Sequence, residues 1–195
     1  MDEQHNPANA YFQNLPLDYR IGSVHLLHST EGEIIDIDTR PEIFKENVER
    51  YLGGDLHQVV LTYFDKLVRM IELGGFDFVG HADKISYNAQ WCEPGILEQK
   101  WYRDKIHDYF TFIAEKKVMI EVNTKTLHRN GFLYPNREHF GLIHQLGIPV
   151  VVNSDAHVPE LINSGRPEAL QWLKEAGFRT VRQLNQGRWI DVPIG

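Results

Sequence analysis

The stretch GGDLHQVVLTYFDKLVRMIELGGFDFVGHAD, residues 53–83, predicts a helix, a strand and the start of a polar loop, in that order. Asp55 is a good N-cap residue, and Gln58 follows three positions later. A long apolar stripe at helical spacing comes next, and a glycine pair ends it. Residues 76–80 (FDFVG) then form a compact predicted strand. A helix that leads directly into a strand is typical of the crossover units of a parallel sheet.

The rest of the chain repeats this alternation with short connections. The predicted strands are 19–24, 76–80, 118–122, 148–152 and 179–182, and the predicted helices are 41–52, 55–73, 96–116, 136–146 and 167–176. Residues 26–40 are interpreted as a loop with a short extended piece at 34–37, and the tail 188–195 as an extended segment packed on the body. We expect a single α/β domain over residues 1–195, with parallel strands joined by right-handed crossover helices.

Composition and charge restrict the class of protein. The chain has 195 residues, of which 42% are hydrophobic and 24% charged, as is ordinary for a globular protein. Its net charge of −7 lacks the basic footprint that nucleic-acid binding needs. The one cysteine fits a reducing compartment, and neither a signal peptide nor an apolar run of about 20 residues is found. We therefore expect a cytoplasmic protein that binds neither nucleic acid nor membrane.

Side chains able to bind a metal or a phosphate group follow four of the predicted strands. These are His25 after the first strand, His81 after the second, Glu121 and Asn123 at the end of the third, and Asp155 and His157 after the fourth. Because the carboxyl ends of parallel strands lie on one face, residues far apart in sequence are expected to converge there. Imidazole and carboxylate groups together bind zinc, manganese or iron, and the sequence does not choose among these metals.

The other histidines have simpler interpretations. A single histidine after a strand usually bonds a backbone carbonyl, and only the four strand ends taken together predict a metal site. We interpret His57, His107 and His144 as solvated or cap-related residues within helices, His139 as a residue of the first turn of a helix, and His5 as part of the N-terminal segment. Two more histidines, His28 and His128, lie in loops on the expected active face and stay open as candidates.

Five short runs, in this order, carry a family resemblance. They are IGSVH (21–25), FDFVGHAD (76–83), EVNT (121–124), YPNRE (134–138) and NSDAH (153–157). Together with the stretch 53–83 and with EALQWLKEAGF (168–178), they resemble the polymerase-and-histidinol-phosphatase (PHP) superfamily, and within it the histidinol-phosphate phosphatases. The resemblance covers nearly the whole chain and rests on the ordered set, since no single run is decisive.

The resemblance implies a distorted seven-stranded TIM-like (β/α) barrel. At its strand ends it implies up to three divalent metals and the hydrolysis of L-histidinol phosphate to L-histidinol and phosphate, a step of histidine biosynthesis. By matching motifs, the catalytic metal ligands would be His25, His81, Asp155 and His157, with Glu121 and Asn123 close behind them. The candidates for holding the substrate phosphate are Arg129 first, then Arg137 and Lys84.

The chain departs from the family pattern at its N-terminal side. The family begins with a His-x-His motif, a further histidine and a glutamate, and none of these has a match here, although Glu3 and His5 lie near that place. We therefore expect the carboxyl-side portion of the barrel, with the strand at 19–24 on an exposed edge. Such an edge allows a homo-oligomer. Fewer ligands also predict fewer metals, bound more weakly.

Three functions stay open from the sequence. The first is a metal-dependent phosphatase acting on histidinol phosphate or on another small phosphate monoester. The second is a truncated PHP fragment, weakly active or inactive, that retains partial metal binding. The third is a different metal hydrolase, acting on amides or phosphodiesters, which the ordered motifs disfavour.

Overall fold

A four-stranded parallel sheet forms the centre of the computed structural model, which describes residues 6–195; Glu3 and His5 lie outside the described residues. Its strands run in the order β1 (Ile21–Gly22), β4 (Phe78–Val79), β5 (Met119–Asn123) and β6 (Val150–Asn153). Every neighbouring pair is parallel. The predicted parallel sheet is confirmed, and β1 lies at its edge as expected.

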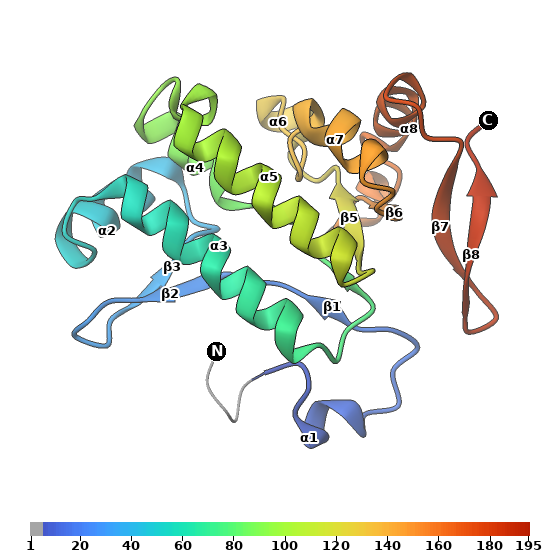
Figure 1. The fold of residues 1–195 in the computed structure, drawn as a ribbon, viewed down its shortest axis with the longest axis horizontal. Coiled ribbons are helices and arrows are strands. Elements are labelled where there is room, and N and C mark those ends of the chain that lie inside the picture. Colours follow the sequence, from blue (N-terminus) through green and yellow to red (C-terminus); the bar gives the residue numbers. More distant parts are fainter. Residues whose placement is uncertain (1–5) are drawn as a thin grey trace.

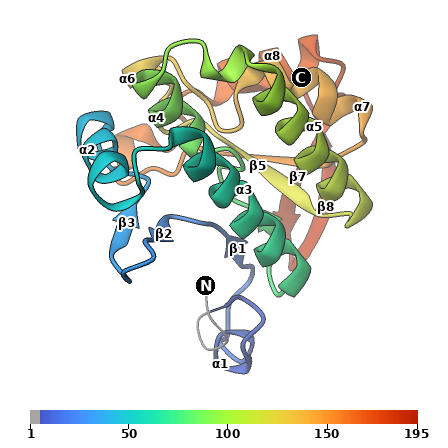
Figure 2. The same ribbon diagram turned by 60° about the vertical axis from the view of Figure 1, so that its left-hand side comes forward.

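Helices connect and cover these strands. The longer ones are α2 (Pro41–Tyr51), α3 (Leu56–Leu73), α4 (Ile85–Cys92), α5 (Lys100–Glu115), α7 (Phe140–Gln145) and α8 (Arg166–Glu175). Short turns of helix are α1 (Ala10–Gln13), α6 (Leu127–Asn130), η1 (Ile96–Glu98), η2 (Arg137–His139) and η3 (Pro159–Leu161). Figure 1 shows α3 and α5 side by side, with α4 next to them. Turned by 60°, the same helices lie on one side of the strands, and α1 projects beyond β1 (Figure 2).

The helix α3 is the element that the sequence predicts best. Asp55 caps it, because its Oδ1 accepts the backbone N–H of Gln58 at 2.9 Å. The predicted stripe is buried, with Tyr63, Phe64 and Leu67 fully enclosed in the hydrophobic core. The helix ends at Gly74, whose φ of +68° is a left-handed conformation that glycine adopts at no steric cost. The long predicted helix at 96–116 is also found, although its first part is the separate turn η1.

Two hairpins flank the parallel sheet. β2 (Leu26–His28) pairs antiparallel with β3 (Ile34–Asp36), so the expected extended piece is present but the region is a hairpin and not a loop. β7 (Thr180–Asn185) pairs antiparallel with β8 (Arg188–Pro193). The predicted last strand is therefore paired with the extended tail, outside the parallel sheet. β7 and β8 are antiparallel and joined by a short turn, so they pair without a crossover helix.

The hairpin of β7 and β8 contacts β4 and the segment that precedes β1. Trp189 donates its indole N–H to Asp77 Oδ1 at 3.0 Å. Its ring packs edge-on against Phe78 and Tyr19, with centroid distances of 5.7 and 5.9 Å. The hairpin is thus fixed to the strand β4 through one large aromatic side chain.

In residues 6–195, no helix has the length and apolar character that a membrane span needs.

Candidate metal and phosphate site

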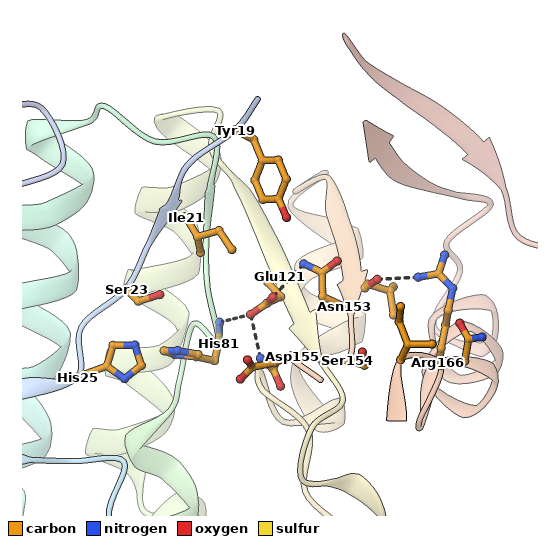
Figure 3. A pocket seen from close by; sticks show the side chains of 14 residues that line it. Tyr19, Ile21, Ser23, His25, His81, Glu121, Asn153, Ser154, Asp155 and Arg166 are labelled. Carbon is orange, nitrogen blue, oxygen red and sulfur yellow. Dashed lines mark hydrogen bonds between the residues drawn. The ribbon is translucent and has the colours of Figure 1, made fainter. Parts of the chain in front are cut away.

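A pocket of about 580 Å³ opens at the carboxyl ends of the parallel strands. Its lining residues are Tyr19, Ile21, Ser23, His25, His81, Glu121, Asn123, Val152, Asn153, Ser154, Asp155, Ile162, Asn163 and Arg166. Of the predicted site residues, five line this pocket, as Figure 3 shows for most of them. His157 follows the same strand as Asp155 but lies outside the lining.

The two histidines that follow β1 and β4 face each other. The rings of His25 and His81 have centroids 4.7 Å apart and stand at 83° (Figure 3). His81 is buried, and its Nδ1 has no hydrogen-bond partner among the described residues. Burial lowers the pKa of His81 to about 4, and the charges of His25 and Lys84 act in the same direction. A neutral imidazole with a free buried nitrogen suits a metal ligand.

A buried carboxylate lies directly behind His81. Glu121 Oε2 accepts the backbone N–H of His81 at 3.0 Å and the side-chain amide of Asn123 at 3.1 Å. Its other oxygen, Oε1, accepts the side-chain amide of Asn153 at 2.9 Å. The carboxylate is therefore bonded on both oxygens by neutral N–H donors, and β5 and β6 hold the donors in place.

The residues after β6 are more open to solvent. Asp155 has a left-handed φ of +48°, and its carboxylate pairs with Lys125 Nζ at 3.1 Å. The side chain of His157 is 70% exposed, and its Nδ1 lies 2.9 Å from the backbone oxygen of Asp155. The loop thus presents one carboxylate to the pocket, with a histidine beside it on the solvent side.

A second pocket, of about 470 Å³, is lined by two of the predicted phosphate-binding residues, Lys84 and Arg129, and shares no lining residue with the first. The Nζ of Lys84 lies 2.7 Å from Asp38 Oδ1 and 4.5 Å from the ring centre of Tyr134. Asp38 Oδ2 lies 3.7 Å from His25 Nδ1, so Asp38 links the two pockets. Burial alone would raise the pKa of Asp38, but its contacts with His25 and Lys84 outweigh burial and lower it.

Arg137, the third phosphate candidate, lies elsewhere. Its guanidinium stacks 5.0 Å from the ring centre of Trp172, and it lines neither of these two pockets. The open candidates His28 and His128 contact Lys66 at 3.3 Å and Glu168 at 3.7 Å. The structure therefore separates Arg137 from the two cations that share a pocket.

Three polar residues near the pockets were not singled out from the sequence. Asp38 lies in the region interpreted as a loop, where the alternation IIDID was the available signal. Asn153 stands in the quoted run NSDAH, but only Asp155 and His157 of that run were assigned a role. Arg166 begins α8 and donates to the backbone oxygen of Val152 at 2.6 Å, a contact that depends on tertiary structure.

The donor set fits part of a divalent metal site. Imidazole and carboxylate ligands are present in one pocket, and the free Nδ1 of His81 is a buried nitrogen that lacks a partner in residues 6–195. Within the same residues, no three His, Cys, Asp or Glu side chains are grouped closely enough to hold a metal ion by themselves. A complete shell would therefore need side-chain movement or further ligands.

Residues 2–125 match the PHP domain family. The chain belongs to the PHP domain family. Two curated relatives are named probable histidinol-phosphatases: one of Clostridium acetobutylicum, 23% identical over 92% of this chain, and one of Deinococcus radiodurans, 27% identical over 84%. The PHP chain spans only 64% and 56% of the length of these two relatives. The sequence resemblance to this family is thereby confirmed.

Two crystal structures share the fold of this PHP chain. One, from Listeria monocytogenes, is named as a candidate histidinol phosphatase and has a TM-score of 0.67 at 24% identity, covering 76% of this chain and 56% of that one. The other is a histidinol phosphate phosphatase of Lactococcus lactis in complex with zinc, L-histidinol and phosphate. It has a TM-score of 0.56 at 15% identity, covering 97% of this chain and 68% of that one. The predicted fold class is confirmed.

Proposed function

We propose that this chain is a metal-dependent phosphoesterase that hydrolyses a small phosphate monoester, with L-histidinol phosphate as its substrate. The observation that carries the proposal is the meeting of His25, His81 and Asp155 in one pocket, where His81 Nδ1 has no partner among the described residues. The family match and the names of its relatives support the choice of reaction and substrate.

The proposed roles follow from where each side chain lies. His25, His81 and Asp155 hold a divalent ion, zinc, manganese or iron, and His157 joins them from the solvent side. When bound, such an ion acts as a Lewis acid toward the phosphoryl group and makes water more acidic. Lys84 and Arg129, which share the second pocket, hold the phosphoryl oxygens and offset their growing charge. Arg137 is the weakest phosphate candidate because it stacks on Trp172.

Hydrolysis of L-histidinol phosphate with added zinc, manganese or iron tests the proposal. We expect turnover in the native chain and at least 100-fold lower activity in His81→Ala. Mutating a residue that supports a metal ligand lowers activity by about 10–100-fold, and removing a ligand itself should lower it further. His107→Ala, on the exposed surface of α5, is the matched control and should retain full activity. Equal rates in the native chain and His81→Ala would refute the metal-site proposal, and a panel of other phosphate monoesters tests the substrate.

A second candidate is a weakly active protein that binds a single metal. It is favoured by the lack of a three-ligand group within residues 6–195. In that case we expect about one bound ion per chain and turnover well below the usual enzyme range of roughly 1–1000 per second. The turnover number of the metal-loaded chain distinguishes the two candidates, because the first expects a rate within that range.

We also propose that the chain forms a homo-oligomer through the edge at β1. Leu17, Tyr19 and Ile21 are exposed beside this edge, and an unpaired strand edge readily adds another strand. Light scattering should give a mass above that of one chain, and a stable monomer would contradict the proposal.

The free thiol of Cys92 supports a reducing location, and we propose the cytoplasm.

A further inference from the structure

The backbone of His81 has an unusual conformation. Its φ is +31°, a left-handed value that side chains with a Cβ rarely adopt. The residue follows β4 directly, and its carbonyl accepts the N–H of Lys84 in the next turn. A non-glycine residue keeps such a conformation only where its surroundings hold it there. His81 is also the histidine whose ring nitrogen is buried and unpartnered among the described residues.

Glu121 is the group that holds this backbone. Its Oε2 accepts the N–H of His81 at 3.0 Å, and its side chain is only 4% exposed. No ion pair within residues 6–195 involves Glu121, so its role is not to neutralise a neighbouring cation. A buried amide without an acceptor is costly, and this hydrogen bond removes that cost only while His81 stays in its turned conformation.

The donors around Glu121 favour a carboxylate at this position. Asn123 donates to Oε2 and Asn153 donates to Oε1. The amide of Asn123 cannot be reversed without loss, because its Oδ1 already accepts the N–H of Lys125 at 3.0 Å. A glutamine would keep an acceptor at His81 if its NH₂ group turned toward Asn153 and the Asn153 amide reversed, whereas a leucine removes the acceptor altogether.

We propose that Glu121 is a positioning residue that fixes the left-handed backbone of His81 and so aims its imidazole at His25 and the pocket. The ring contact between the two histidines, with centroids 4.7 Å apart, is the result of this arrangement. The inference rests on the proposed function only in taking His81 as a metal ligand. The hydrogen bond and the ring placement stand apart from that function.

The variants Glu121→Leu and Asn153→Ala separate this role from a general stabilising one. Glu121→Leu removes the acceptor of the His81 N–H, whereas Asn153→Ala removes only a donor to the other oxygen. In Glu121→Leu we expect loss of the nuclear Overhauser contacts between the His25 and His81 rings and zinc affinity at least 10-fold weaker. Asn153→Ala should keep the ring contacts and lose less zinc affinity than Glu121→Leu, and Glu46→Leu on the exposed face of α2 is the control.

Two outcomes overturn the proposal. One is a folded Glu121→Leu variant with native ring contacts and native zinc affinity, and the other is equal loss of both in Asn153→Ala. If Glu121→Leu does not fold, the native chain still decides, through the scalar coupling that NMR detects across the hydrogen bond, between the His81 amide nitrogen and the Glu121 carboxyl carbon. Its absence refutes the proposal. A native chain that shows this coupling but binds none of zinc, manganese and iron refutes the proposed function and leaves the positioning role intact.

Discussion

The two halves of the candidate site are built differently. The inner half comprises His81, Glu121, Asn123 and Asn153, and its hydrogen bonds join β4, β5 and β6. The outer half comprises His25, Asp155 and His157, with side chains 46%, 37% and 70% exposed. His25 and Asp155 make ion pairs at the surface, which contribute little and rearrange readily, and His157 bonds the backbone oxygen of Asp155 two residues away. The inner half is therefore set by the fold before a ligand arrives, whereas the outer half is free to adjust to one.

The sharpest test of this difference is metal affinity. His81→Ala should weaken zinc binding by more than 100-fold, because it removes a preset ligand. His157→Ala should weaken it by less than about 10-fold, because the outer side chain must first be ordered. Isothermal titration calorimetry at fixed pH measures both. A larger effect at His157 would show that the exposed half, and not the buried one, dominates binding.

Phosphate binding gives the next comparison, between Lys84 and Arg137. Lys84→Met should raise the KM for the phosphate ester by roughly 10–100-fold, as expected for loss of a hydrogen bond to a charged group. Arg137→Met should leave KM unchanged, since its guanidinium stacks on Trp172 and lines neither pocket. Steady-state kinetics of both variants provide the measurement. A KM effect confined to Arg137→Met would reverse the assignment.

Packing beneath the inner half can be tested at Gly80. A Cβ added there would lie 2.6 Å from Ser23 Oγ and 2.8 Å from Ile21 Cγ2, so Gly80→Ala overpacks the contact between β1 and β4. We expect a loss of about 1–3 kcal/mol in the free energy of unfolding. Gly141→Ala, in α7 where an added Cβ meets nothing within 4 Å, should instead gain about 0.5–1 kcal/mol. Urea denaturation distinguishes the two variants. An unchanged free energy of unfolding in Gly80→Ala would mean that β1 and Ser23 move to make room for the added Cβ.

The smallest expected effects concern pH and the buried pair of Asp83 and His139. Burial raises the pKa of Asp83 to about 7 and lowers the pKa of His139 to about 4. In His139→Phe the folded state keeps the Asp83 proton that the unfolded state loses, so stability should fall as pH rises from about 4 to 7. In Asp83→Asn the unfolded state takes up the His139 proton, so stability should fall as pH drops from about 6.5 to 4.

In the native chain these two dependences oppose each other and should largely cancel between pH 4 and 6.5. Unfolding free energies measured by urea at several pH values give the slopes, each at most about 1.4 kcal/mol per pH unit for one proton. A slope of the opposite sign in either variant would contradict the protonation state assigned to the residue that remains. Asp83 Oδ2 and His139 Nε2 lie 3.8 Å apart.

The sequence predicts the central elements because their patterns are strong. The stretch 53–83 contains a cap, an apolar stripe and a glycine stop, and all three appear in the structure. The helix α4 was not predicted, because two of its four buried side chains, Ser86 and Asn88, are polar and interrupt the apolar period. The two-residue turn at Gln186-Gly187, both with positive φ, is a hairpin signal that the separate interpretation of strand and tail overlooked.

The part of the site that directly follows the strands could be predicted, because the strand pattern is strong. Residues that directly follow a strand, such as His81 and Asp155, are placed by the sheet, and so they share a pocket. Asp38 reaches His25 and Lys84 through a hairpin whose course is not encoded in local periodicity. The left-handed backbone of His81 depends on a carboxylate 40 residues away, which no local pattern reveals.

The contact of Trp189 with Asp77 has a consequence for how the chain is made. The two residues are separated by 112 positions, and at about 5–20 residues per second a ribosome needs roughly 6–22 s to pass from one to the other. During that time Phe78 and Tyr19 lack their contact with the Trp189 ring, while the contacts within α3 can already form. Such long-range closure slows folding. Tyr19 and Phe78 gain the contact with Trp189 only after nearly the whole described chain has been made, so we expect this part of the molecule to close late in folding.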